Sequence, residues 1–432
     1  MGKNRRSNGV KQYIIIGNSA AGIAAVEAIR KLDNKSKITV VSDEDSPSYC
    51  RCLISYYLAG DIKEENILYR PDSFYKDNDV RLLLNKKVVR IDPKKGAVRF
   101  DDKNEEGYDE LLIATGASPK FPDIKGIKRK GVFGFRTMAD AKAIGSLLPK
   151  ARNVCILGGG LIGLKAAYAL SKKGLGVKVI VKSRQVLSQV LDPESAGLVQ
   201  KRLEDHGIEI LPGKDAAEII GENDVKAVRL DDGNIIDASL VIACKGVSPN
   251  IDLVNGSGIK TEEGIVADEK LATNIANIHA AGDVCETFDP ALGALSVNAL
   301  WPVAVEQGRA AGTDMAGGKI TYDGSVGMNS LEFFGLPTVS FGMYKIKEPD
   351  GFEELKVLNA ASSLYKKVIL RGNTLVGAIL VGDIRASGLY LRLIREKVDV
   401  SSFKDKLLEG NLSYPDIMNF INDKKDKENM YV

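Results

Sequence analysis

Two glycine-rich turns, each placed directly after a hydrophobic strand, constrain the fold of this chain most. The first turn belongs to the stretch YIIIGNSAAG that ends at Gly22, and the second to VCILGGGLIG, which ends at Gly163. A turn without bulky side chains lets the backbone approach a pyrophosphate closely, and the N-terminus of the following helix stabilises its negative charge. The two turns predict two dinucleotide sites, formed by Gly17, Ser19, Ala21 and Gly22 in the first and by Gly158, Gly160, Ile162 and Gly163 in the second.

The segments around both turns alternate between strand and helix patterns, which indicates parallel sheets with ligands at the carboxyl ends of their strands. We therefore predict an α/β fold with two Rossmann-like dinucleotide-binding domains and a small α+β C-terminal domain. The predicted divisions are a disordered basic arm at 1–11, the first dinucleotide domain at 12–120, the second at 121–245, a return to the first at 246–322, and a C-terminal domain for partner binding or dimerisation at 325–432.

The C-terminal region has its own pattern. Strand-like runs at 367–370 and 375–381 precede an amphipathic helix from Ala386 to about Lys397. The lysine-rich tail from Asn422 is expected to be frayed.

Composition excludes several classes of function. The net charge is only +3 and the basic residues are spread along the chain, so we expect no nucleic-acid partner. The apolar runs are strand-sized and no signal-type segment is present, which predicts a cytoplasmic protein without a membrane span. The five cysteines show no zinc spacing, and with two histidines in the chain we expect neither a metal site nor histidine-based acid–base catalysis.

The residues after the second strand of each unit predict the nucleotide contacts. Glu44, with Asp43 in reserve, is placed to accept hydrogen bonds from a ribose hydroxyl pair, although both acids could instead cap a loop. In the second unit, Lys182 and Arg184 stand where an NAD site places a carboxylate, and cations there attract the 2′-phosphate of NADP. This pair favours NADPH and leaves NADH open, since both residues could be ordinary surface charge.

Three further motifs carry a family resemblance. The segments LIATG at 112–116, GVSPN at 246–250 and IHAAGD at 278–283, together with the two turns, resemble the pyridine nucleotide-disulfide oxidoreductase superfamily. Its branches include NADH oxidases, coenzyme A-disulfide reductases, rubredoxin reductases and the flavin part of nitrite reductases. The resemblance implies an enzyme with FAD at the first turn and NAD(P)H at the second. It also assigns Ala114, Thr115, Gly116, Gly246, Gly282 and Asp283 to cofactor binding, with Asp283 on the ribityl chain.

The segment SYCRCLISYY at 48–57 resembles the redox-cysteine region of this superfamily. Cys52 matches the single redox cysteine of coenzyme A-disulfide reductases and NADH oxidases, and Arg51 matches a flavin-contacting arginine of the rubredoxin- and nitrite-reductase branches. An inert cysteine beneath the flavin ring is the alternative for Cys52. If this stretch is helical, the Cys50 and Cys52 side chains project about 200° apart, so we expect them not to meet.

The remaining features bear on the electron acceptor. Lys165 stands where relatives often have a glutamate near the nicotinamide, and the C-terminal domain resembles the shorter form of rubredoxin and nitrite reductases. We therefore expect an NAD(P)H oxidoreductase that exchanges electrons with an iron–sulfur protein of the rubredoxin or ferredoxin type. The alternatives are a thiol-dependent reductase of disulfides, persulfides, peroxide or oxygen through Cys52, and a nicotinamide-binding redox sensor without turnover. A homodimer is left open.

Overall fold

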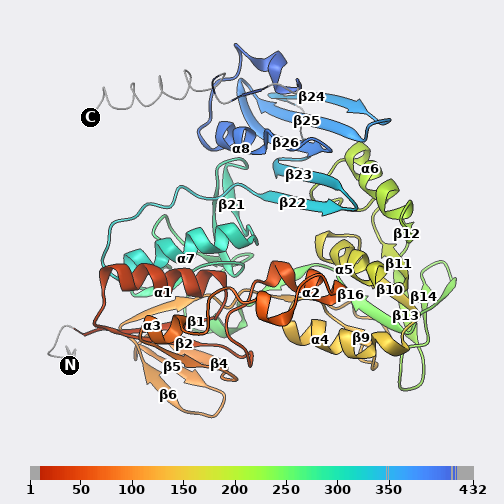
Figure 1. The fold of residues 1–432 in the computed structure, drawn as a ribbon. Helices are drawn as coiled ribbons and strands as arrows, with labels where there is room; N and C mark the ends of the chain where they lie inside the picture. Colours follow the sequence, from red (N-terminus) through yellow and green to blue (C-terminus); the bar gives the residue numbers. More distant parts are fainter. Residues whose placement is uncertain (1–9, 347, 349, 410–411, 414, 416–432) are drawn as a thin grey trace.

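The computed structural model describes residues 10–346, 348, 350–409, 412, 413 and 415 (Figure 1). Most of the predicted arm at 1–11 and all of the predicted tail from Asn422 lie outside the described residues. The described part confirms the predicted α/β class, with two parallel sheets and an antiparallel C-terminal sheet.

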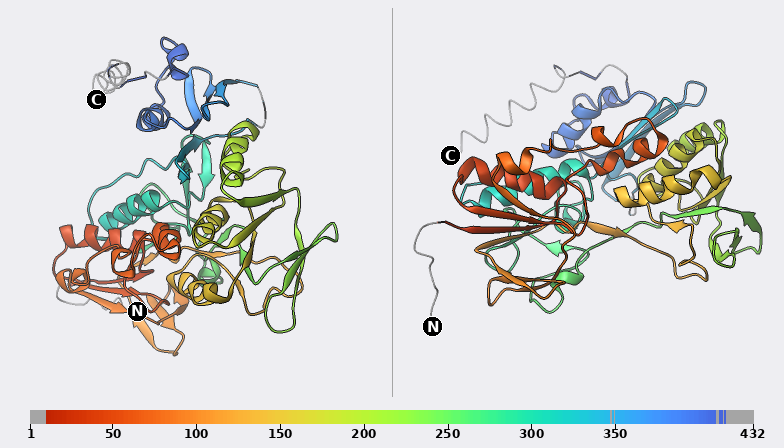
Figure 2. Two further views of the ribbon diagram at one scale, coloured as in Figure 1. Left: turned by 45° about the vertical axis from the view of Figure 1, so that its right-hand side comes forward. Right: turned by 60° about the horizontal axis from the view of Figure 1, so that its bottom comes forward.

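The first parallel sheet has the strand order β19-β7-β1-β2-β3. The order reverses at β1, and the first glycine turn follows β1 there, where open parallel sheets bind their ligands. Helices α1 and α7 lie side by side along one face of this sheet (Figure 1; Figure 2, right). The elements are β1 (Gln12–Ile16), α1 (Ala20–Leu32), β2 (Lys37–Val41), β3 (Val80–Leu83), β7 (Glu110–Ile113), β19 (Ile278–Ala280) and α7 (Trp301–Met315).

The second parallel sheet repeats this arrangement with the order β12-β11-β10-β16-β9. Its β10 is fully buried apart from its first residue, as expected for an aliphatic strand covered on both faces, and α5 starts directly after the second glycine turn. The elements are β9 (Val132–Phe133), α4 (Met138–Leu147), β10 (Asn153–Leu157), α5 (Leu161–Lys172), β11 (Gly176–Val181), α6 (Pro193–Glu204), β12 (Ile208–Pro212) and β16 (Leu240–Ala243).

Smaller elements complete the two units. Two short strands carry the chain between them: β8 leaves the first unit, β17 returns to it, and the two pair antiparallel. These smaller elements are α2 (Ile54–Ala59), α3 (Phe74–Asp77), β4 (Val88–Asp92), β5 (Ala97–Phe100), β6 (Glu105–Gly107), β8 (Ala117–Pro119), β13 (Ala216–Ile220), β14 (Ala227–Leu230), β15 (Ile235–Asp237), β17 (Val247–Pro249), β18 (Ile265–Val266), β20 (Cys285–Asp289) and β21 (Ala294–Ser296).

The C-terminal unit is an antiparallel sheet of order β22-β23-β26-β25-β24 with helix α8 packed against it. Its runs at 367–370 and 375–381 are strands and its amphipathic segment is a helix, as predicted. In Figure 2 this unit stands against α6 of the second unit. The elements are β22 (Met328–Phe333), β23 (Leu336–Gly342), β24 (Phe352–Asn359), β25 (Leu364–Arg371), β26 (Thr374–Val381) and α8 (Ser387–Arg395).

A buried ionic cluster joins the C-terminal sheet to the second unit. Asp192, the N-cap residue of α6, accepts hydrogen bonds from the Ser195 hydroxyl at 2.6 Å and the Tyr365 hydroxyl at 2.5 Å. The Lys367 ammonium lies 3.1 Å from the same carboxylate and 2.7 Å from Glu354. Lys367 is only 4% exposed, so its charge depends on these partners.

Helices α1 and α7 approach closely because two glycines face α1. A Cβ placed on Gly308 would lie 2.1 Å from the Ala21 carbonyl oxygen, and one on Gly312 would lie 2.6 Å from that of Ala25. We expect Gly308→Ala to lower the free energy of unfolding by about 3 kcal/mol, because the helices must separate to admit the methyl group. Urea unfolding followed by circular dichroism measures this.

Gly197→Ala is the matched control for that prediction. Gly197 lies within α6, is exposed, and has no described neighbour within 4 Å of the position that a Cβ would occupy. Alanine there should stabilise the protein by about 0.5–1 kcal/mol. Equal effects of the two substitutions would contradict close packing at Gly308.

Candidate functional site: a cavity at the first glycine turn

A cavity of about 1210 Å³ opens at the carboxyl ends of the first sheet. Its wall combines the first glycine turn, the segments after β2, β7 and β19, and the N-terminal turn of α7. Helix α8 of the C-terminal unit adds Leu391 and Arg395, and Arg395 lies 3.5 Å from Glu306 of α7. The predicted site residues that line the cavity are Gly17, Ser19, Ala21, Asp43, Glu44, Arg51, Cys52, Ala114, Thr115, Gly116, Ile162, Gly282 and Asp283.

The first turn needs glycine at two positions. Gly17 has a φ of +124°, and a Cβ on it would lie 2.1 Å from the Ala114 carbonyl oxygen. A Cβ on Gly22 would lie 2.0 Å from the Gly17 carbonyl oxygen, so Gly22 supports the turn from behind and does not line the cavity. Ser19 is the N-cap residue of α1, and its side chain makes no capping hydrogen bond.

The two acids after β2 differ in what surrounds them. Both carboxylate oxygens of Glu44 are engaged, one by Arg51 and the other by the Tyr49 hydroxyl at 2.6 Å. Arg51 also donates to the Tyr49 hydroxyl at 3.1 Å. Asp43 is exposed, lines the cavity, and makes no side-chain hydrogen bond or ion pair with any described residue. Asp43 therefore has the carboxylate that is free for a ligand.

A second arginine–carboxylate pair crosses the cavity, and its arginine was missed in the sequence. Arg136 donates to the Asp283 carboxylate at 2.6 Å, and both side chains are largely buried. Arg136 directly precedes Thr137, which forms a capping box with Asp140 at the start of α4. The T-x-x-D spacing at 137–140 is a helix-start signal that could have placed Arg136 at the end of a connection, beside the cavity.

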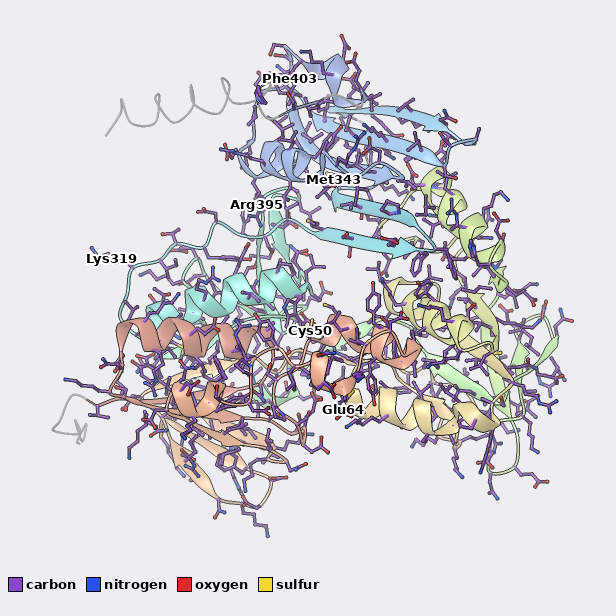
Figure 3. The ribbon with its side chains drawn as sticks, in the orientation of Figure 1. Cys50, Glu64, Lys319, Met343, Arg395 and Phe403 are labelled. Carbon is purple, nitrogen blue, oxygen red and sulfur yellow. The ribbon has the colours of Figure 1, made fainter. Side chains whose placement is uncertain are left out.

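The segment around Cys52 corrects one expectation from the sequence. Cys50 is not helical: it has an extended conformation (φ −79°, ψ 101°) and caps the 3-10 helix η1 (Arg51–Leu53). The prediction that the two thiols do not meet assumed a continuous helix, and that assumption was wrong because the backbone of Cys50 is extended. The Cys52 thiol lowers the pKa of Cys50 to about 7. Cys52 is exposed into the cavity and Cys50 is half-buried behind it. Figure 3 shows Cys50 near the centre of the molecule, where the first two units meet.

The second turn repeats the geometry of the first. Gly158 has a φ of +124°, and a Cβ on it would lie 2.2 Å from the Cys244 carbonyl oxygen, while one on Gly163 would lie 2.1 Å from that of Gly158. Of the second-turn residues that we predicted, Ile162 lines the cavity, whereas Gly158, Gly160 and Gly163 do not.

The predicted phosphate-binding cations lie at the end of β11, outside the cavity. Arg184 is exposed and makes no ion pair with a described residue, and Gly246, with a φ of +94°, likewise lies outside the cavity lining. Lys182 lies 3.5 Å from Asp215, which also accepts from Lys245 at 2.5 Å. Burial raises the pKa of Asp215, but Lys245 and Lys182 lower it by more, so this acid stays charged. No local pattern in the sequence signals that Asp215 lies beside Lys182.

Lys165 faces the cavity from α5. Its ammonium donates to the Tyr56 hydroxyl at 3.2 Å and lies 5.1 Å from the centre of the Tyr56 ring and 5.4 Å from that of Phe333. Attraction to two aromatic faces stabilises a cation without a carboxylate partner. The position therefore carries a positive charge on the cavity wall.

The residues present fit an elongated anionic ligand at the first turn. A Cβ on Gly17 would collide with the backbone, so the first turn stays free of side-chain bulk at that position. The first turn of α1 has no acidic residue that would repel an anion at the helix N-terminus. The buried Asn18 amide nitrogen, beside the turn, has no partner among the described residues. The fold and the two turns together define a protein of the two-domain dinucleotide-binding class, with a glycine turn at the switch point of each parallel sheet.

The chain belongs to the pyridine nucleotide-disulphide oxidoreductase family, whose model matches residues 11–308. The model of the rubredoxin NAD+ reductase C-terminal domain matches residues 328–398. The members of this family are NAD(P)H-dependent flavin oxidoreductases, and the expected family resemblance is confirmed. No helix within the described residues is long and apolar enough to cross a membrane.

Relatives and solved structures agree with this assignment. The chain is 32% identical to a nitrite reductase [NAD(P)H] of Bacillus subtilis over 395 residues, which cover 91% of this chain and 48% of the relative. It is 37% identical to an NADH oxidase of Methanocaldococcus jannaschii over 313 residues, 70% of each protein. The fold matches a covalent putidaredoxin reductase–putidaredoxin complex with a TM-score of 0.86 at 23% identity, over 95% of this chain and 98% of that one. The chain thus spans about half the length of some curated relatives that it matches.

Proposed function

We propose that this enzyme exchanges electrons between NAD(P)H and an iron–sulfur protein of the rubredoxin or ferredoxin type. The match of residues 328–398 to the C-terminal domain of rubredoxin NAD+ reductases carries this proposal. Helix α8 of that unit contributes Leu391 and Arg395 to the cavity wall, so the C-terminal unit lies beside the place where a flavin would be oxidised. Electrons leaving the flavin singly suit an iron–sulfur acceptor.

FAD would occupy the cavity of the first unit. Its pyrophosphate would lie at Gly17 and Ser19, and its ribityl chain at Asp283. For the adenosine ribose we now prefer Asp43 over Glu44, because both oxygens of Glu44 are already engaged. The other residues proposed to hold FAD are Ala21, Gly22, Arg51, Ala114, Thr115, Gly116, Gly246 and Gly282, to which the structure adds Arg136 as a candidate.

NAD(P)H would lie at the second turn, on Gly158, Gly160, Ile162 and Gly163. When bound, the two nucleotides would supply hydride transfer from the nicotinamide to the flavin, chemistry that needs close stacking and exclusion of water more than a protein acid or base. The protein would contribute by holding the nicotinamide ring against the flavin ring. Lys165, held between the Tyr56 and Phe333 rings, would place a positive charge beside this path.

A direct test uses the anaerobic protein with bound FAD. After reduction by NADH or NADPH, we expect rapid electron transfer to rubredoxin or ferredoxin and slow transfer to oxygen and to small disulfides. The Cys52→Ser variant should keep most of its rate with the iron–sulfur protein. A reduced flavin that reacts with neither iron–sulfur protein contradicts the proposal, and a long-lived complex with nicotinamide and no turnover with any acceptor would support the sensor alternative.

The choice of nicotinamide nucleotide depends on Lys182 and Arg184, which favour NADPH in our proposal. Asp215 opposes this preference because it neutralises Lys182. We expect Asp215→Asn to raise the ratio of kcat/KM for NADPH over NADH roughly fivefold, since one charge at a partly exposed site is worth about 1 kcal/mol. Steady-state kinetics with both nucleotides measures the ratio.

Asp232→Asn is the matched control for that variant. Asp232 pairs with Lys214 at 2.7 Å near the same loop and touches neither Lys182 nor Lys245 in the structure. It should leave the ratio unchanged, and Lys182→Ala should shift the ratio toward NADH. If Asp215→Asn has no effect on the ratio, Lys182 does not bind a 2′-phosphate.

A further inference from the structure

A buried glutamine of α7 lies behind the turn that carries Asp283. Gln307 is only 1% exposed and does not line the cavity, whereas Gly282 and Asp283, which follow β19, do. The side-chain oxygen of Gln307 accepts a hydrogen bond at 2.8 Å from the Gly282 amide. The Gly282 amide is therefore satisfied from inside the protein, and this leaves the side chain of Asp283 as the polar group that the turn presents to a ligand.

The other end of the Gln307 side chain is also engaged, and this defines its orientation. Its nitrogen donates to the Thr287 hydroxyl of β20 at 3.2 Å and to the Tyr322 hydroxyl at 3.4 Å. A backbone amide can only donate and a hydroxyl can accept, so the oxygen of Gln307 must face Gly282 and its nitrogen must face the two hydroxyls. Gln307 thus joins α7, β20 and the segment before β22 to the turn after β19.

The backbone of this turn makes it sensitive to the loss of a hydrogen bond. Gly282 has a φ of +81°, and its carbonyl accepts from the Cys285 amide at 2.8 Å. The turn also packs against the start of α1, since a Cβ on Gly282 would lie 3.3 Å from the Cβ of Ala21. A buried amide that loses its partner is costly, so a turn without Gln307 would change its shape to find another acceptor.

We propose that Gln307 is a positioning residue for FAD, which holds the Gly282–Asp283 turn in the shape that binds the ribityl chain. This inference rests on the proposed FAD site and adds to it a residue that does not touch the cofactor. Because Gln307 acts through Gly282, its loss should weaken FAD binding by more than a comparable loss of stability elsewhere in the first unit. Methionine has nearly the length and volume of glutamine but cannot replace its hydrogen bonds, so Gln307→Met isolates their effect.

Release of FAD from the full-length holoprotein tests the inference. The holoprotein is diluted in steps, and the fluorescence of free FAD gives both the Kd and the rate constant of dissociation. Gln307→Met should raise the Kd at least about tenfold, because the Gly282 amide loses its buried partner. Gln307→Glu keeps an oxygen opposite that amide and should bind FAD more tightly than Gln307→Met. Urea unfolding followed by circular dichroism shows that each variant is folded and measures its stability.

Gln12→Met is the matched control. Gln12 is a buried glutamine of the same unit whose side-chain nitrogen donates to the Thr39 hydroxyl at 3.2 Å. It is the first residue of β1 and lies at the end of that strand away from the first glycine turn. Gln12→Met should lower the free energy of unfolding and leave the Kd for FAD unchanged.

Three outcomes would overturn the inference: an unchanged Kd in Gln307→Met, an equal rise of the Kd in Gln12→Met, or FAD binding by Gln307→Glu that is no tighter than that of Gln307→Met. A wild-type protein that binds no FAD would overturn the inference and the proposed function together. Wild-type protein that holds FAD tightly but transfers no electrons to rubredoxin or ferredoxin would contradict the proposed function alone, so the two failures are distinguishable.

Discussion

Gly158→Ala is expected to give a protein that binds FAD but is no longer reduced by NAD(P)H. Gly158 adopts a φ of +124°, and a Cβ there would lie 2.2 Å from the Cys244 carbonyl oxygen, so the second turn must change shape to accept alanine. Backbone strain of this kind costs about 1–3 kcal/mol before the clash is added, and we expect flavin reduction to slow at least ~100-fold. Anaerobic stopped-flow absorbance of the flavin measures the rate.

Gly174→Ala provides the control for that variant. Gly174 follows α5 with a φ of +77° and has no described neighbour within 4 Å of a Cβ, so alanine there adds strain without a clash at the turn. It should lower stability by about 1 kcal/mol and leave flavin reduction by NAD(P)H unchanged. Dithionite should reduce the flavin of both variants. Normal reduction of Gly158→Ala by NAD(P)H would show that the second turn does not hold the nicotinamide nucleotide.

Lys367→Met is expected to destabilise the protein by about 3–5 kcal/mol, because it removes one partner of a buried ionic cluster. Asp192, 7% exposed, would lose the ammonium that lies 3.1 Å from it. Lys356→Met is the matched control, since Lys356 lies opposite Lys367 on β24 but is exposed and pairs with Glu194 at 2.6 Å. It should cost less than about 1 kcal/mol. Urea unfolding measures the free energy of unfolding of both variants. Equal losses in the two variants would contradict the claim that burial makes Lys367 more important for stability than the exposed Lys356.

The effect of Lys367→Met should also depend on pH. Burial raises the pKa of Asp192, but hydrogen bonds from Ser195 and Tyr365 and the charge of Lys367 lower it by more, to below its ordinary value of 3.8. A carboxylate with a lowered pKa contributes stability above its ordinary pKa and loses it as the pH falls through its folded value. The difference between wild type and variant should therefore be complete at neutral pH and shrink below pH 3.8. A stability difference between wild type and Lys367→Met that grows as the pH falls would contradict this prediction.

The sequence was sufficient for the fold because the signals that determine it are local. Each glycine turn lies between a strand and a helix, and each strand or helix that we predicted is present in the structure within a few residues of its expected bounds. The cavity residues of the first unit could also be predicted, since turns and strand ends of a parallel sheet meet at one edge.

The partners of the charged side chains could not be predicted, because they come from distant parts of the chain. Arg136 meets Asp283 across the cavity, and Asp215 meets Lys182 from another connection. Nothing in the local sequence specifies such pairs. The conformation of Cys50 was missed for a different reason: a single extended residue precedes η1, and no local signal in the sequence distinguishes it from the start of a longer helix.

The paired strands β8 and β17 have a mechanical consequence. Both connections between the two nucleotide-binding units run through this one narrow ribbon, with Ser118 opposite Ser248. The side-chain amide of Asn250 donates to the Thr115 carbonyl at 2.8 Å and fixes the end of the ribbon nearest the first unit. The ribbon is not the only link between the units, because Ile54 and Leu58 of α2 belong to one buried cluster with Leu164 of α5. The second unit is held to the first at two separate places, which fixes its orientation more firmly than the two connections alone would.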